Sequence, residues 1–132
     1  MSLRELERQM SLIVPTIDEL VALDHPYRPL LRVIDFGKLT RSLGKLYSDL
    51  GRGGYPVEQG FRCLLFQYVE DLSDRQAERF LRENLAAKLF CSFELLTPTP
   101  EFSYFSRLRS RIGLAELTKL YNRFGILCRR RV

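Results

Sequence analysis

The clearest chemical pattern in this 132-residue sequence is a run of arginines and serines near its C-terminal end. Phe105, Leu108 and Ile112 recur at helical spacing and predict the buried row of one helix. Arginine pairs with phosphates and with the guanine edge, and a short serine lets a helix backbone approach DNA closely. We therefore expect a DNA-facing helix here, with a polar solvent-exposed face as the alternative. Its expected contact residues are Ser103, Ser106, Arg107 and Ser110 on the outward side, and Arg109 and Arg111 on the flanks.

A second row of arginines follows a tight join between two predicted helices at residues 70–73. Arg75, Arg79 and Arg82 are spaced i, i+4 and i+7, so they share one helix face. The spacing of the join is typical of a helix-turn-helix element. Acidic neighbours reduce the positive charge of this face, and we expect it to be the secondary DNA-binding face. These neighbours are Asp74, Glu78 and Glu83.

The charge of the chain is unevenly distributed. The formal net charge is +5. Residues 101–132 carry eight basic and two acidic residues, whereas residues 1–100 carry 13 basic and 14 acidic residues. The whole positive excess therefore lies in the last quarter of the sequence, which indicates a local anionic partner such as nucleic acid. The alternative is a solvated helix face followed by a basic tail.

Groups that would support catalysis do not converge in the sequence. The only histidine, His25, precedes a proline, and a lone histidine in a turn is more typical of a structural role. Glu78 and Arg82 lie one helical turn apart and predict a surface ion pair. Cys63, Cys91 and Cys128 form no CxxC motif, which argues against a disulfide framework or a zinc site. We expect no catalytic residue, no metal and no cofactor, and therefore not an enzyme.

A helical scaffold is predicted to position these residues. Almost every segment has the helical period, so we expect an all-α fold in which residues 1–132 form one compact domain. This domain should contain five to seven helices with helix-turn-helix-like elements. The most apolar helix, predicted over residues 57–71, should lie at its centre. The inward positions of this helix are Val57, Phe61, Leu64, Leu65, Tyr68 and Leu72.

Polar residues mark the expected helix starts. Capping boxes are predicted for Thr16 with Glu19 and for Ser73 with Gln76. Further predicted N-caps are Asp35, Asn84 and Ser103.

Neither a membrane span nor an export signal is apparent. The longest apolar stretch, around residues 63–69, is far shorter than the roughly 20 residues that a bilayer requires. The first ten residues mix acids and bases and lack the apolar core of a signal peptide. We expect a cytoplasmic protein with no membrane partner.

Three ordered motifs allow a more specific interpretation. Across residues 20–112 the chain contains DHPYRPLLRVIDF, then LYSDLGRGGYPVEQGFRCLLFQYVEDLSDRQAERFLRENLAAKLF, then TPEFSYFSRLRSRIG. Their order and spacing resemble the InsH-type N-terminal domain of bacterial insertion-sequence transposases. In one respect the chain departs from this family, which often has Asp-His or Asp-Arg before the serine of the last motif. Here that serine, Ser103, follows Glu101 and Phe102.

The resemblance implies a small helical domain that helps to bind transposon-end DNA during transposition, a form of DNA recombination. In this family the chemistry is carried out by a following DDE domain, which uses divalent metal to cut and join DNA. Residues 113–132 form a basic helix and tail and show none of the strands that would begin such a domain. We therefore expect a truncated, non-catalytic transposase segment.

Two other functions fit the same residues. The helices can serve as a protein-interaction module that assembles transposase subunits, either as a homo-oligomer or by joining or inhibiting an intact transposase. The many apolar residues of the last predicted helix favour this alternative. The other possibility is an inactive transposase remnant.

Overall fold

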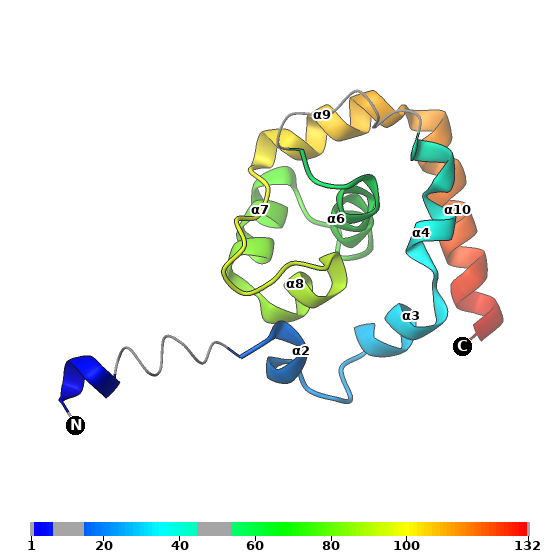
Figure 1. Cartoon of the computed structure of the whole chain (residues 1–132). Helices are drawn as coiled ribbons and strands as arrows, with labels where there is room; N and C mark the ends of the chain where they lie inside the picture. Colours follow the sequence, from blue (N-terminus) through cyan, green and yellow to red (C-terminus); the bar gives the residue numbers. More distant parts are fainter. Residues whose placement is uncertain (1, 7–14, 45–53, 132) are drawn as a thin grey trace.

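The computed structural model of the chain describes residues 2–6, 15–44 and 54–131, with the side chain of residue 131 left aside. All regular secondary structure in these ranges is helical, which confirms the predicted fold class (Figure 1). From residue 17 onward the described ranges contain nine helices, more than the expected five to seven. The difference arises mainly from residues 17–43, which form several short helices instead of a few longer ones. They are α2 (Ile17–Leu20), α3 (Tyr27–Val33), α4 (Phe36–Leu39), the 3-10 turn η1 (Arg41–Leu43), α6 (Val57–Val69), α7 (Asp74–Glu83), α8 (Leu85–Cys91), α9 (Phe102–Ile112) and α10 (Leu114–Arg131).

Helix α6 forms the centre of the molecule, as its apolar pattern predicts. Phe61, Leu64 and Leu65 are almost completely buried, and α6 contacts α7, α8 and α9. In Figure 1 these three helices and α10 surround it. Because apolar burial is the main driving force of folding, this helix fixes the positions of the others.

The exposed fractions correct one expectation about inward-facing residues. Tyr68 was predicted to be inward on α6, but it is 64% exposed. Phe80 on α7 and Leu114 on α10 are likewise exposed. Residues 68 and 114 lie where α6 ends and α10 begins, beyond the layer of helices that covers the core. The helical period of a sequence identifies which side of a helix is apolar. It does not show which part of that side neighbouring helices cover.

The predicted helix starts are largely confirmed. Thr16 with Glu19 and Ser73 with Gln76 each form a reciprocal capping box. Asp35 accepts a hydrogen bond from the Lys38 backbone N–H at 3.0 Å. Asn84 caps α8 in the same way, accepting from the Ala87 N–H. The sequence also predicts a helix over residues 36–46 and a glycine-rich loop over residues 51–56, and residues 45–53 of these segments lie outside the described ranges.

One expected N-cap is wrong. Helix α9 begins at Phe102, so Ser103 lies inside its first turn and does not cap it. The cap position belongs to Glu101, whose side chain makes no capping hydrogen bond. Instead, Glu78 of α7 accepts a hydrogen bond from the Phe102 backbone N–H at 2.6 Å. A residue from a neighbouring helix therefore satisfies one of the free N–H groups at the start of α9.

Turn geometry sets the directions of α7 and α10. Asp71 adopts φ 53° after α6. The Leu72 N–H reaches back to the Gln67 carbonyl at 2.9 Å, which closes a Schellman motif. Gly113, between α9 and α10, has φ 88°, a conformation that a side chain would strain. Helix α10 therefore starts in a new direction, as Figure 1 shows.

Candidate nucleic-acid interface

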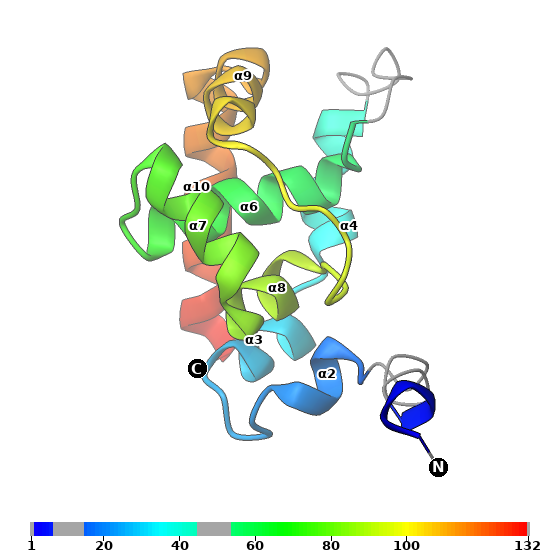
Figure 2. The same ribbon diagram turned by 90° about the vertical axis from the view of Figure 1, so that its left-hand side faces the viewer.

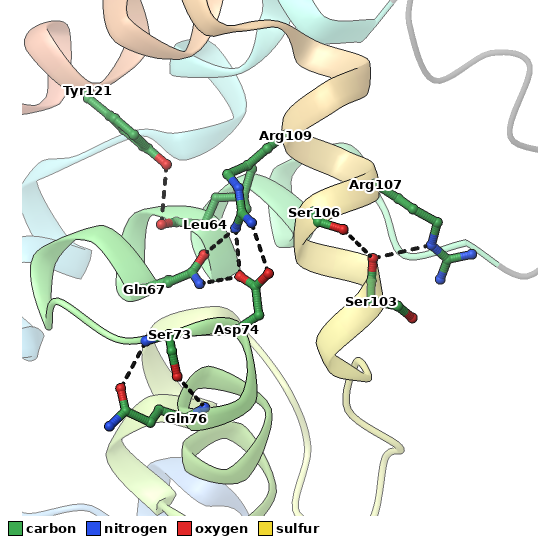
Figure 3. A network of polar contacts seen from close by, with 10 residues as sticks. All are labelled: Leu64, Gln67, Ser73, Asp74, Gln76, Ser103, Ser106, Arg107, Arg109 and Tyr121. Carbon is green, nitrogen blue, oxygen red and sulfur yellow. Dashed lines mark hydrogen bonds and ion pairs between the residues drawn. The ribbon is translucent and has the colours of Figure 1, made fainter.

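The solvent-exposed face of α9 carries most of the predicted contact residues. Phe105, Leu108 and Ile112 are buried, as expected. This burial turns the opposite side of the helix to solvent, where the backbone presents serine and arginine side chains. Ser106, Arg107, Ser110 and Arg111 are exposed, and Ser103 is half-buried. The Arg107 Nε donates to the Ser103 carbonyl at 3.3 Å, which leaves its terminal nitrogens directed outward (Figure 3).

Arg109 has a different environment from the other arginines of α9. Its guanidinium forms a bidentate ion pair with Asp74 of α7, with nitrogen–oxygen distances of 2.8 and 2.9 Å. It also donates to the Gln67 side-chain oxygen of α6 at 2.9 Å, and Gln67 in turn donates to Asp74 at 2.6 Å. These three residues form a polar clamp between α6, α7 and α9 (Figure 3). We refer to Gln67, Asp74 and Arg109 as the clamp.

The electrostatics of the clamp agree with its geometry. The hydrogen bond from Arg109 holds the pKa of the Asp74 carboxyl below its ordinary value. Reciprocally, the hydrogen bond to Asp74 raises the pKa of the Arg109 guanidinium. Both side chains are partly shielded from water, at 37% exposed for Arg109 and 27% for Asp74. A bidentate pair in such a setting fixes orientation as well as contributing free energy.

We expect replacement of Arg109 by alanine to lower the free energy of unfolding by about 1–3 kcal/mol, the cost of leaving a hydrogen-bonded charged group without its partner. Urea denaturation would measure it. Arg107→Ala, on the exposed side of the same helix, is the matched control and should change stability by less than about 0.5 kcal/mol. Equal effects of the two substitutions would show that the clamp does not stabilise the domain.

The same clamp predicts a pH dependence. A lowered pKa for Asp74 means that its stabilising contribution is complete above the ordinary value of 3.8. The contribution decreases as pH falls from that value through the folded-state pKa. The stability difference between the wild type and Asp74→Asn should therefore be constant near neutral pH and shrink below pH 3.8. A difference that stays the same at pH 3 would contradict this account.

The predicted arginines of α7 lie on its exposed side. The Arg75 guanidinium stacks over the Phe102 ring of α9 at 4.3 Å, a cation–π contact. Arg82 pairs with Glu78 at 3.4 Å, which confirms the expected surface pair. Arg79 is exposed and forms no ion pair within the part of the chain that the structure describes. Of the three arginines, Arg79 therefore has the least restricted side chain.

The exposed sides of α7 and α9 adjoin each other. Asp74, at the start of α7, contacts Arg109 near the end of α9. One turn further along α7, Glu78 contacts Phe102 at the start of α9. The two helices are therefore antiparallel neighbours, and each buries its apolar side in the same core. We call their joined solvent-exposed surface the α7–α9 face.

Sequence reasoning missed the residues that hold this face together. Gln67 and Asp74 are 42 and 35 positions away from Arg109, and Glu78 is 24 positions from Phe102. Nothing in the local pattern marks them as partners, because residues this far apart meet only through the tertiary fold. The one signal that the sequence offers is the presence of Asp74 among the arginines of α7. From the sequence alone, Asp74 only reduces the positive charge of that helix face.

A separate hollow lies beside the clamp, on the side of α6 and α10. It has a volume of about 700 Å³, and Arg109 is at its edge. Tyr68 and Tyr121 stack within it, with ring centroids 4.5 Å apart and an angle of 16° between the rings. Burial raises the pKa of Tyr121 to about 12, and its hydroxyl donates to the Leu64 carbonyl at 3.3 Å. We call this hollow the tyrosine groove, and its remaining lining includes Asp71, Leu72, Leu114, Leu117, Thr118 and Asn122.

The described residues show neither a metal centre nor a membrane-spanning helix. They contain no cluster of three or more histidine, cysteine, aspartate or glutamate side chains positioned to hold a metal ion. In the same ranges, the helices all lack the length and apolar character needed to cross a bilayer. The described residues instead form the arginine- and serine-rich α7–α9 face, whose two helices pack on the core.

Comparison with protein families gives a match over most of the chain. Residues 15–111 fit the family model described as Transposase domain (DUF772). The match covers the clamp, the exposed residues of the α7–α9 face, and all helices from α2 to α9 except Ile112, the last residue of α9. Curated proteins and solved structures yield no match.

Proposed function

Because the chain belongs to this transposase domain family, we propose that it is a non-catalytic DNA-binding domain that helps to bind transposon-end DNA through the α7–α9 face. The residues assigned to contact DNA are the exposed arginines of this face that form no ion pair within the described residues. The bacterial cytoplasm is its expected site of action.

The observation that carries the proposal is the composition of the exposed side of α9. Between Ser103 and Arg111 this helix contains no acidic residue. Arg107 and Arg111 are exposed, and within the described ranges neither forms an ion pair. Such arginines neutralise DNA phosphates and release the cations condensed on the DNA, and this release supplies most of the affinity of a non-specific complex. Serines between them let the helix approach the duplex closely.

Differences in exposure and pairing support different roles for the arginines that the sequence grouped together. We assign Arg107 and Arg111 of α9 and Arg79 of α7 as phosphate contacts, because their guanidinium groups are accessible. Arg75 and Arg82 have existing partners and are assigned to the edge of the face. Arg109 is assigned a positioning role through the clamp, because contact with DNA would break its pair with Asp74.

Salt dependence of DNA binding tests the proposal. Three phosphate contacts predict that log K falls by roughly 3 for each tenfold increase in salt. A labelled duplex titrated with the wild-type domain at several salt concentrations, with fluorescence anisotropy as the readout, would measure this slope. Absence of binding at low salt, or binding that does not change with salt, would contradict the proposed function.

One observation favours a second candidate function, the protein-interaction module for transposase assembly or inhibition. The tyrosine groove exposes Tyr68 and, at 83% exposed, Leu114. Exposed large apolar residues around a hollow are typical of interaction surfaces. Light scattering on the same sample separates the two functions, because a stable dimer without DNA affinity at low salt would support the interaction module instead.

A further inference from the structure

The outer face of α10 presents a second row of basic residues. Leu117, Leu120 and Phe124 turn inward and are buried. Lys119, Arg123 and Arg130 follow at i, i+4 and i+11, so they share the side of α10 that points away from the core. Arg129 adds a fourth exposed cation beside them. From Lys119 to Arg130 the row extends for roughly 16 Å at the rise of an α-helix.

The basic residues of α10 far outnumber its acidic ones. The helix has one acidic residue, Glu116, and residues 117–131 contain none. Glu116 lies one turn before Lys119 on the same side of the helix, where it accepts a hydrogen bond from the Ser42 hydroxyl of η1 at 3.0 Å. Across the described ranges, the ion pairs involve none of these four cations. Four cations beside one acidic residue leave a net positive charge, which attracts a polyanion.

The position of α10 separates this row from the α7–α9 face. Figure 1 shows α7 and α10 on opposite sides of α6. After rotation by 90°, Figure 2 shows α7 in front of α6 and α10 behind it. Both helices bury one side in the core and expose the other, so the exposed sides of α7 and α10 point in different directions, with α9 running between the two helices. DNA is stiff over this distance, with a persistence length of about 150 bp, so one straight segment does not reach both.

We propose that the outer face of α10 binds the phosphate backbone of a second DNA duplex, so that one domain holds two duplex segments at once. This inference rests on the proposed function, because the first duplex occupies the α7–α9 face. The row consists of Lys119, Arg123, Arg129 and Arg130 without intervening serines, which suits contact with phosphates and not with base edges. Binding on this side is therefore independent of DNA sequence.

A two-duplex capture experiment tests this proposal. Wild-type protein is bound to an immobilised duplex at low salt, and retention of a second, fluorescent duplex is measured. The triple variant Lys119→Gln, Arg123→Gln, Arg130→Gln should lose at least tenfold of this retention, while its own binding to the immobilised duplex changes by less than about threefold. The matched control, Arg32→Gln, Lys38→Gln, Arg41→Gln, removes the same charge from exposed positions on α3, α4 and η1 and should retain the second duplex as the wild type does.

The outcomes separate this inference from the proposed function. Retention of the second duplex by the α10 variant at the wild-type level overturns the inference and leaves the α7–α9 assignment intact. Equal loss in the control variant overturns it as well, because the effect would then depend on net charge alone. Failure of the wild type to bind even the immobilised duplex would instead overturn the proposed function.

Discussion

Replacing Phe105 by alanine is expected to lower the free energy of unfolding by about 3–5 kcal/mol, the range for truncating a fully buried phenylalanine. Phe105 has no exposed surface and lies on the inward side of α9, within the main core cluster. Its loss leaves a cavity under the helix that carries the candidate contact residues. Since small domains have a total stability of about 5–15 kcal/mol, a large part of it would be lost. Urea denaturation followed by far-ultraviolet circular dichroism would measure the change.

Phe102 provides the matched control for this substitution. It is on the same helix but is 39% exposed, with its ring against the Arg75 guanidinium. Alanine at position 102 keeps the backbone N–H that Glu78 accepts, so we expect a loss of about 1 kcal/mol or less. A smaller effect at position 105 than at position 102 would show that α9 is not packed on the core in this orientation.

Removal of both accessible arginines of α9 is expected to weaken DNA binding by about 10- to 100-fold at 0.1 M salt, because each phosphate contact contributes close to one unit of log K under these conditions. The variant is Arg107→Gln with Arg111→Gln. Its salt slope should be flatter by up to about 1.8, the value for two contacts. Fluorescence anisotropy with a labelled duplex measures both quantities. Stability should change little, since both side chains are exposed.

Arg4→Gln with Arg32→Gln is the control for net charge. Both residues are exposed, and both lie outside the α7–α9 face. The control removes the same charge and should change affinity by no more than about threefold. If the two double variants lose affinity equally, DNA responds to the overall charge of the domain and not to this helix.

The sequence predicted local features well because their causes are local. A capping box joins residues three positions apart, so Ser73 with Gln76 was recognisable without any knowledge of the fold. The inward row Phe105, Leu108 and Ile112 was recognisable for the same reason, since helical periodicity requires only neighbouring turns. The all-α class followed from such signals repeated along the chain.

Features that depend on distant residues could not be predicted in this way. Arg109 has the same sequence context as Arg107 and Arg111, and only the approach of Asp74 from another helix distinguishes it. Tyr68 continues the apolar row of α6, yet the surrounding helices do not cover it. The N-cap of α9 is Glu101, two residues before the predicted Ser103, and Glu78 of α7 accepts a hydrogen bond from the first N–H group of the helix. In each case the deciding partner belongs to a different element.

An NMR titration of the isotope-labelled domain with unlabelled duplex DNA tests the central claim most directly, because it reports which backbone amides respond to DNA. We predict the largest shifts along α9 from Ser103 to Arg111 and along α7 around Arg79, with larger shifts there than in the tyrosine groove. Shifts concentrated around Tyr68 and Leu114, or an unchanged spectrum at low salt, would contradict the assignment of DNA binding to the α7–α9 face.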